Sequence, residues 1–154
     1  MNEKFLILER NIQNDLANIE RLYEALGEPG PSGAVSAKDL VFIAYHLHGL
    51  YTAFENVFRN IAAVFENQLD SAEWHRQLLQ RMRLDLTPLR PAVIDAEMYE
   101  KLRELLGFRH FFRTAYGVDL DPVKLREVLH SALELKPLYR EQIERFLGFL
   151  RALE

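Results

Sequence analysis

Apolar residues recur at helical spacing along nearly the whole chain, and this pattern restricts the possible folds more than any other feature. In the first segment Phe5, Ile12 and Ile19 lie seven residues apart, and leucines fill the same stripe. Such a stripe packs against partner helices that run nearly parallel or antiparallel to it. No segment has the sustained polar and apolar alternation of a half-buried strand. The sequence therefore predicts an all-α fold.

Turn and capping residues divide this pattern into separate helices. Ser36 or Asp39 is a suitable start for the second helix, and Asp121 followed by Pro122 is a suitable start for a later one. The final helix is expected to follow Pro137, and Gly49 is a possible kink in the second. We expect helices over about residues 3–26, 36–69, 71–82, 95–115, 121–133 and 137–152.

These helices predict an up-and-down antiparallel bundle with four main helices and additional short ones. The 154 residues fit one domain, so residues 1–154 are expected to form a single unit. Apolar residues make up 49% of the chain and charged residues 27%, which is the balance of an ordinary folded protein. The absence of cysteine excludes disulfides and cysteine-ligated zinc or iron–sulfur centres.

Charge and hydropathy indicate the cellular location of such a chain. The apolar runs are too short to cross a bilayer, and the N-terminal MNEKFLILERNIQND has charges on both sides of its apolar stretch. We therefore expect a cytoplasmic protein without a membrane role. The net charge of −4 argues against indiscriminate nucleic-acid binding, although it leaves room for a local basic site.

Side chains that commonly carry chemistry do not form a familiar metal or hydrolase motif. His46 and His48 lie about 200° apart around a helix, and no HExxH or GxSxG pattern occurs. We therefore expect neither a metal nor a cofactor. Tyr51, Glu55 and Arg59 share one helical face. They form either an intrahelical ion pair beside a tyrosine or the wall of a polar cleft.

Basic residues gather in the second half of the chain, and most of them are arginines. The segment LLGFRHFFRTAYG places arginines among aromatic residues, a combination that suits a nucleic-acid backbone with unstacked bases. The alternative is a core helix with a solvated basic face. The cluster comprises Arg76, Arg81, Arg83 and Arg90 around the third helix and Lys101, Arg103, Arg109 and Arg113 on the fourth.

A likeness to a known family is carried by the segment LRELLGFRHFFRTAYGVDLD. It resembles the signature helix of HEPN-domain proteins, and more narrowly that of the HepT-like group, ribonuclease toxins paired with minimal nucleotidyltransferase (MNT) antitoxins. The stretches HGLYTAFENVFRNIA, WHRQLLQRMRLDLTPLRPAVI and DPVKLREVL are also similar in order and spacing, so the likeness covers about residues 40–133. It implies an all-α HEPN-type bundle that forms homodimers, with two signature helices facing each other across a cleft.

The family motif is an arginine, a polar residue, a short spacer, then histidine, one residue and tyrosine. In this chain Arg109, His110 and Tyr116 match or nearly match it, whereas Thr114 stands where the catalytic histidine is expected. The resemblance implies metal-independent RNA cleavage, in which the histidine transfers a proton and the arginine stabilises charge on the phosphate. Threonine cannot serve as a general base at neutral pH.

Three interpretations stay open. In the first, the chain keeps the fold but has lost the endoribonuclease activity. In the second, His110 replaces the missing group about one helical turn earlier, with Arg109 as its catalytic partner. Arg103, Arg113 and Tyr116 are then the expected RNA contacts. In the third, the chain is a non-catalytic helical dimer that binds, or presents itself to, a nucleotidyltransferase.

Two further expectations concern the end of the signature segment. The resemblance implies that Tyr116 accepts AMP from an MNT-type partner, which would place phosphate charge beside Arg109 and Arg113. The alternative is that Tyr116 only packs beside a cap at Gly117. The adjacent Phe111 and Phe112 cannot both face one core, so at least one is expected at an interface.

Overall fold

The computed structural model describes residues 2–27, 36–66, 74–114 and 120–154, with only the helical backbone at 74–76 and 110–114. The described residues form helices and no β-strand, so the all-α prediction is confirmed. Leu86 and Arg90 form one isolated bridge in the connector before the fourth helix. The helices are α1 (Glu3–Gly27), α2 (Ala37–Phe65), α3 (Trp74–Met82), α4 (Ala96–Thr114) and α5 (Pro122–Leu153).

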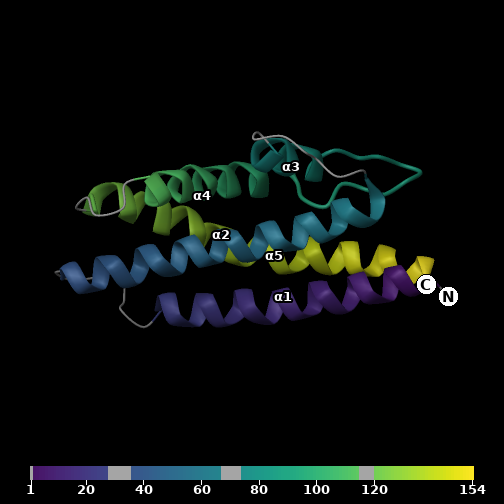
Figure 1. Ribbon diagram of the computed structural model, residues 1–154, viewed down its shortest axis with the longest axis horizontal. Coiled ribbons are helices and arrows are strands. Elements are labelled where there is room, and N and C mark those ends of the chain that lie inside the picture. The colour runs from purple at the N-terminus through teal and green to yellow at the C-terminus, as the bar shows by residue number, and fades with distance from the viewer. Residues whose placement is uncertain (1, 28–35, 67–73, 115–119) are drawn as a thin grey trace.

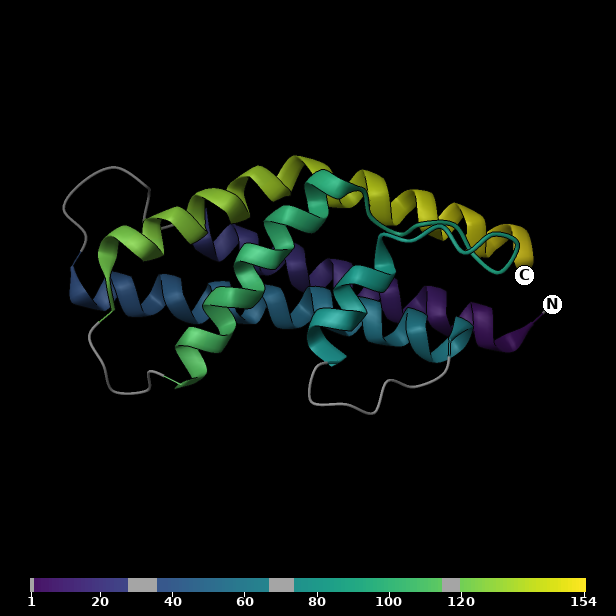
Figure 2. The ribbon, with the colours of Figure 1, turned by 90° about the horizontal axis from the view of Figure 1, so that it is seen from above.

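The four longer helices alternate in direction along the chain, and the two termini lie at the same end of the bundle (Figure 1). Helices α1, α2 and α5 run side by side, whereas α4 crosses them obliquely (Figure 2). Helix α4 contacts both α2 and α5, and the short α3 lies against α2 and α4. The bundle prediction is therefore confirmed, with α4 tilted against the other three long helices.

Capping side chains explain where several helices begin. The Ser36 hydroxyl accepts from the Asp39 N–H at 3.2 Å, and the Asp39 carboxylate accepts from the Ser36 N–H at 3.3 Å. The Asp121 carboxylate accepts from the Val123 N–H at 3.0 Å, and Pro122 begins α5. Both predicted starts are confirmed. The expected caps at Ser71 and Gly117 lie outside the described residues.

Helix α5 corrects one prediction, because it is a single helix where two were expected. Pro137 lies inside it, lacks an N–H for the helical hydrogen bond and disfavours a helix by about 3 kcal/mol. Leu135 and Tyr139, on either side, are both buried, and burying such side chains stabilises the fold by roughly 1.5–3 kcal/mol each. Packing therefore outweighs the proline penalty, and α5 is bowed instead of broken (Figure 2).

Helix α2 runs without interruption through Gly49. A Cβ atom at this position would lie 3.5 Å from Cδ2 of Leu22, so the glycine lies at the close contact between α1 and α2. The apolar stripe of α1 is buried along its length against α2 and α5. The two aromatic rings of Tyr23 and Tyr139 stack with centroids 5.5 Å apart and link α1 to α5. These contacts form the base on which α3 and α4 lie.

Candidate functional site between α2 and α4

The motif arginine pairs with a carboxylate from another helix. Nη1 of Arg109 on α4 lies 3.1 Å from Oε1 and 3.0 Å from Oε2 of Glu55 on α2. The Arg109 side chain is 13% exposed and that of Glu55 is 4% exposed. The pair therefore lies almost entirely inside the contact between the two helices.

The helical register of both segments produces this pair. Glu55 lies on the buried face of α2, between Phe54 and Phe58, and Arg109 directly follows the buried Phe108 on α4. A buried carboxylate without an opposite charge is strongly unfavourable. Arg109 therefore stabilises the fold by pairing with Glu55, whatever ligand it also contacts. The spacing in α2 predicts that Tyr51, Glu55 and Arg59 share one face, but it gives no indication of Arg109 as the partner of Glu55.

Tyr51 completes the described part of this site. Its ring centroid lies 5.9 Å from Cζ of Arg109, and the residue is buried. Burial, and then the negative charge of Glu55, raise the pKa of the Tyr51 phenol, while Arg109 lowers it. The phenol therefore stays protonated at neutral pH, and its ring packs beside the guanidinium of Arg109.

The geometry limits what Arg109 can do chemically. Both oxygens of Glu55 accept from the same nitrogen, so the pair lacks the two-nitrogen fork of the strongest arginine–carboxylate contacts. The carboxylate offsets much of the arginine charge while fixing the position of the guanidinium. The arrangement can thus present a positioned arginine to a phosphate, with a smaller net charge than an isolated arginine has.

The other predicted site residues are only partly described. Arg103 is 64% exposed, with Nη1 3.9 Å from the Glu100 carboxylate. It lies six residues before Arg109, about 240° around α4, and therefore on a different face. The side chains of His110, Arg113 and Thr114, and the whole of Tyr116, lie outside the described residues, as do the side chains of Phe111 and Phe112. Their roles stay predictions.

The model of the HepT-like protein family matches residues 42–150. The chain belongs to this family, within the HEPN superfamily. No curated protein and no solved structure matches the chain. The match begins in the second turn of α2 and ends within α5, so it includes Glu55 and Arg109, whereas α1 lies outside it.

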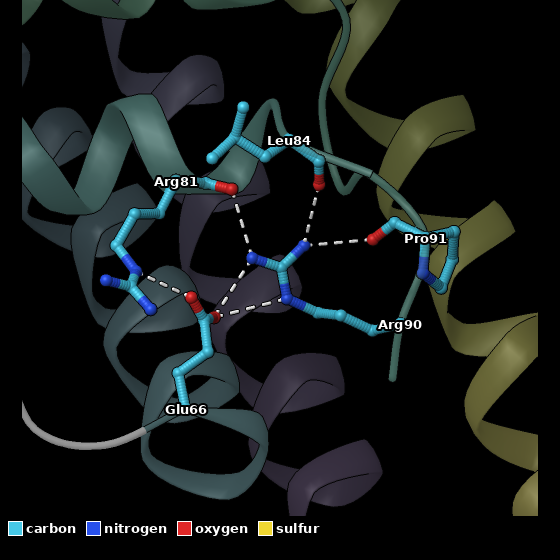
Figure 3. A network of polar contacts seen from close by, with 5 residues as sticks. All are labelled: Glu66, Arg81, Leu84, Arg90 and Pro91. Carbon is cyan, nitrogen blue, oxygen red and sulfur yellow. Dashed lines mark hydrogen bonds and ion pairs between the residues drawn. The ribbon is translucent and has the colours of Figure 1, made fainter. Parts of the chain in front are cut away.

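A second basic group of this HepT-like protein is a buried network (Figure 3). The Arg90 side chain is 0% exposed, and its Nε and Nη2 lie 3.2 and 2.9 Å from Oε2 of Glu66. Its Nη1 donates to the carbonyls of Leu84 and Pro91, and Nη2 also donates to that of Arg81. Arg90 therefore links the connector between α3 and α4 to Glu66 at the end of α2 and to the last turn of α3. Its expected place in a phosphate-binding cluster is wrong, because these protein contacts enclose the guanidinium.

Two features common in other proteins are absent from the described part of this HepT-like chain. None of its helices combines the length and apolarity required to span a bilayer. Within the same residues, no three histidine, aspartate or glutamate side chains are grouped as metal ligands.

Proposed function

We propose that this HepT-like protein is the toxin-type component of a toxin–antitoxin pair and acts on RNA at the face of α4 that carries Arg109 and His110. The observation that carries the proposal is the ion pair between Arg109 and Glu55. It fixes the motif arginine at the edge of the α2–α4 contact, where 13% of its side chain remains exposed. A guanidinium held in this way needs little reorganisation to contact a phosphate oxygen.

The proposed chemistry needs no metal. Arg109 would stabilise the developing negative charge on the scissile phosphate. His110, the next residue on α4, would take the proton of the ribose 2′-hydroxyl as that oxygen attacks phosphorus, and return a proton to the leaving 5′-oxygen. Thr114 stands one turn further on and cannot perform this transfer.

A second candidate function is non-catalytic. Here the protein is a helical homodimer that binds an MNT-type nucleotidyltransferase, with Tyr116 as the residue that accepts AMP. Two observations favour it: the threonine at position 114, and the partial neutralisation of Arg109 by Glu55. In both cases we place the protein in the cytoplasm, with an MNT-type antitoxin as its partner.

An RNA-cleavage assay in the presence of EDTA separates the two functions. The proteins compared are the wild type, His110→Ala and Thr114→His, with Arg21→Gln on the exposed face of α1 as a control. Circular dichroism confirms that each variant is helical. Cleavage by the wild type that disappears in His110→Ala supports catalysis through His110.

The other outcomes are equally informative. No cleavage by the wild type, together with cleavage by Thr114→His, would mean that the site is assembled but lacks a base. No cleavage by any of the four proteins would contradict the RNA-cleaving function and support the partner-binding one.

A further inference from the structure

A cavity of about 400 Å³ lies where α3 ends and the connector begins, apart from the α2–α4 site. This volume falls in the range of small-ligand pockets, roughly 300–1,000 Å³. The cavity is open to solvent, since several of its lining side chains are exposed. Its lining consists of Gln77, Gln80, Arg81, Arg83 and Leu84.

Arg81 is oriented by the buried network beside this cavity. Its Nε lies 2.7 Å from Oε1 of Glu66, whose side chain is buried, and its own side chain is 38% exposed (Figure 3). Within the described residues, its two terminal nitrogens make no hydrogen bond. The guanidinium is thus fixed at one nitrogen and keeps its outer donors for a ligand.

The charges of the network leave this site positive. One carboxylate, that of Glu66, serves two guanidiniums, because Arg90 binds its second oxygen. The two guanidiniums carry two positive charges against one negative charge on Glu66, so one positive charge is not neutralised. Because Arg90 is completely enclosed, this charge is exposed to solvent at Arg81. An anion in the cavity would compensate this charge.

Arg83 adds a second positioned guanidinium. Its Cζ lies 4.6 Å from the ring centroid of the buried Tyr99, a cation–π contact that helps to position the group. No carboxylate of the described chain lies within ion-pair distance of Arg83. Asp85 is close in sequence, but its carboxylate accepts from the backbone and hydroxyl of Thr87.

We propose that this cavity binds a phosphate group through Arg81 and Arg83. Two guanidiniums match the several oxygens of a phosphate, whereas a single one suffices for a carboxylate. The amides of Gln77 and Gln80 can both donate and accept, so they suit the polar group attached to the phosphate. That phosphate is either the monoester of a free nucleotide or a diester of an RNA backbone. The site depends neither on Arg109 nor on RNA cleavage.

Titrations of the full chain test this site with three probes: inorganic phosphate, AMP and a short single-stranded 2′-O-methyl RNA. Binding is followed by calorimetry and by the NMR signals of the arginine Nε–H and glutamine amide groups. We expect saturable binding that weakens about tenfold in Arg83→Gln, because one charged hydrogen-bond donor group is lost. Arg21→Gln removes the same charge from α1 and should bind like the wild type.

The probes distinguish the two sources of phosphate. Binding of phosphate and AMP, but not of RNA, that weakens in Arg83→Gln would identify a nucleotide site. Binding of RNA alone that weakens in Arg83→Gln would identify a backbone contact at this cavity. The proposal is overturned if no probe saturates, or if Arg83→Gln and Arg21→Gln bind equally well. A loss of RNA binding confined to Arg109 variants would concern the proposed function and leave this cavity untouched.

Discussion

Glu55 of α2 and Arg109 of α4, 54 positions apart in the sequence, form an ion pair in which one arginine nitrogen contacts both carboxylate oxygens. The residue that matches the HepT-like motif therefore also joins two helices. A variant of Arg109 can fail either because the fold is weakened or because a ligand contact is lost. Experiments on this residue must separate stability from binding.

Arg109→Ala should lower the free energy of unfolding by about 3 kcal/mol, since it removes the partner of a buried carboxylate. Urea denaturation followed by circular dichroism measures this change. The control is Glu141→Gln, in an exposed pair with Arg145, which should change stability by less than about 1 kcal/mol. Equal stability of Arg109→Ala and the control would show that the pair does not hold α4 on α2.

Glu66→Gln should destabilise the protein by about 3 kcal/mol, because the enclosed Arg90 then loses its counter-charge. Arg81→Gln keeps the pair of Glu66 with Arg90 and should cost about 1 kcal/mol or less. Thermal and urea unfolding of both variants compare these effects. The assignment of Arg90 as a structural residue fails if Glu66→Gln destabilises the protein less than Arg81→Gln does.

Asp15 should make the stability depend on pH. It is buried on α1, accepts from Nδ2 of Asn56 at 2.9 Å, and its pKa is raised above 3.8, chiefly by burial. A raised pKa means that the folded state binds the proton more tightly than the unfolded state. Stability is therefore lost as the pH rises above 3.8 and through the folded-state pKa.

Asp15→Asn removes this charge while keeping the shape of the side chain. Its melting temperature should exceed that of the wild type at pH 7, and the difference should shrink at pH 3. Melting curves at several pH values test the sign of this pH dependence, with the exposed Glu141→Gln variant on α5 as a comparison. A wild type that is more stable than Asp15→Asn at pH 7 would contradict the assignment.

Local signals in the sequence were sufficient to predict most of the fold. The heptad-like stripe predicted α1, and the capping residues Ser36 and Asp121 predicted the starts of α2 and α5. The predicted break at Pro137 is wrong, because the helix penalty of a proline is visible in the sequence. The burial of Leu135 and Tyr139, which outweighs it, depends on tertiary packing.

The candidate site was harder to predict, because its contacts join distant segments. Spacing placed Glu55 beside Arg59 on one helical face, but Arg109 comes from α4. Likewise, a cluster of arginines in the sequence cannot reveal that Arg90 is enclosed while Arg81 and Arg83 line a cavity. The family resemblance, which the HepT-like match bears out, drew attention to Arg109 but gave no indication of its pairing with Glu55.

The most direct test of the proposed function is the affinity for a fluorescent single-stranded 2′-O-methyl RNA, measured by anisotropy in EDTA for the wild type and Arg109→Lys. Lysine keeps the positive charge beside Glu55 but loses the planar donor fork. We expect RNA binding by the wild type, about tenfold weaker binding by Arg109→Lys, and no change in Arg21→Lys. Equal affinity of Arg109→Lys and the wild type would mean that Arg109 serves only the packing of α4 on α2.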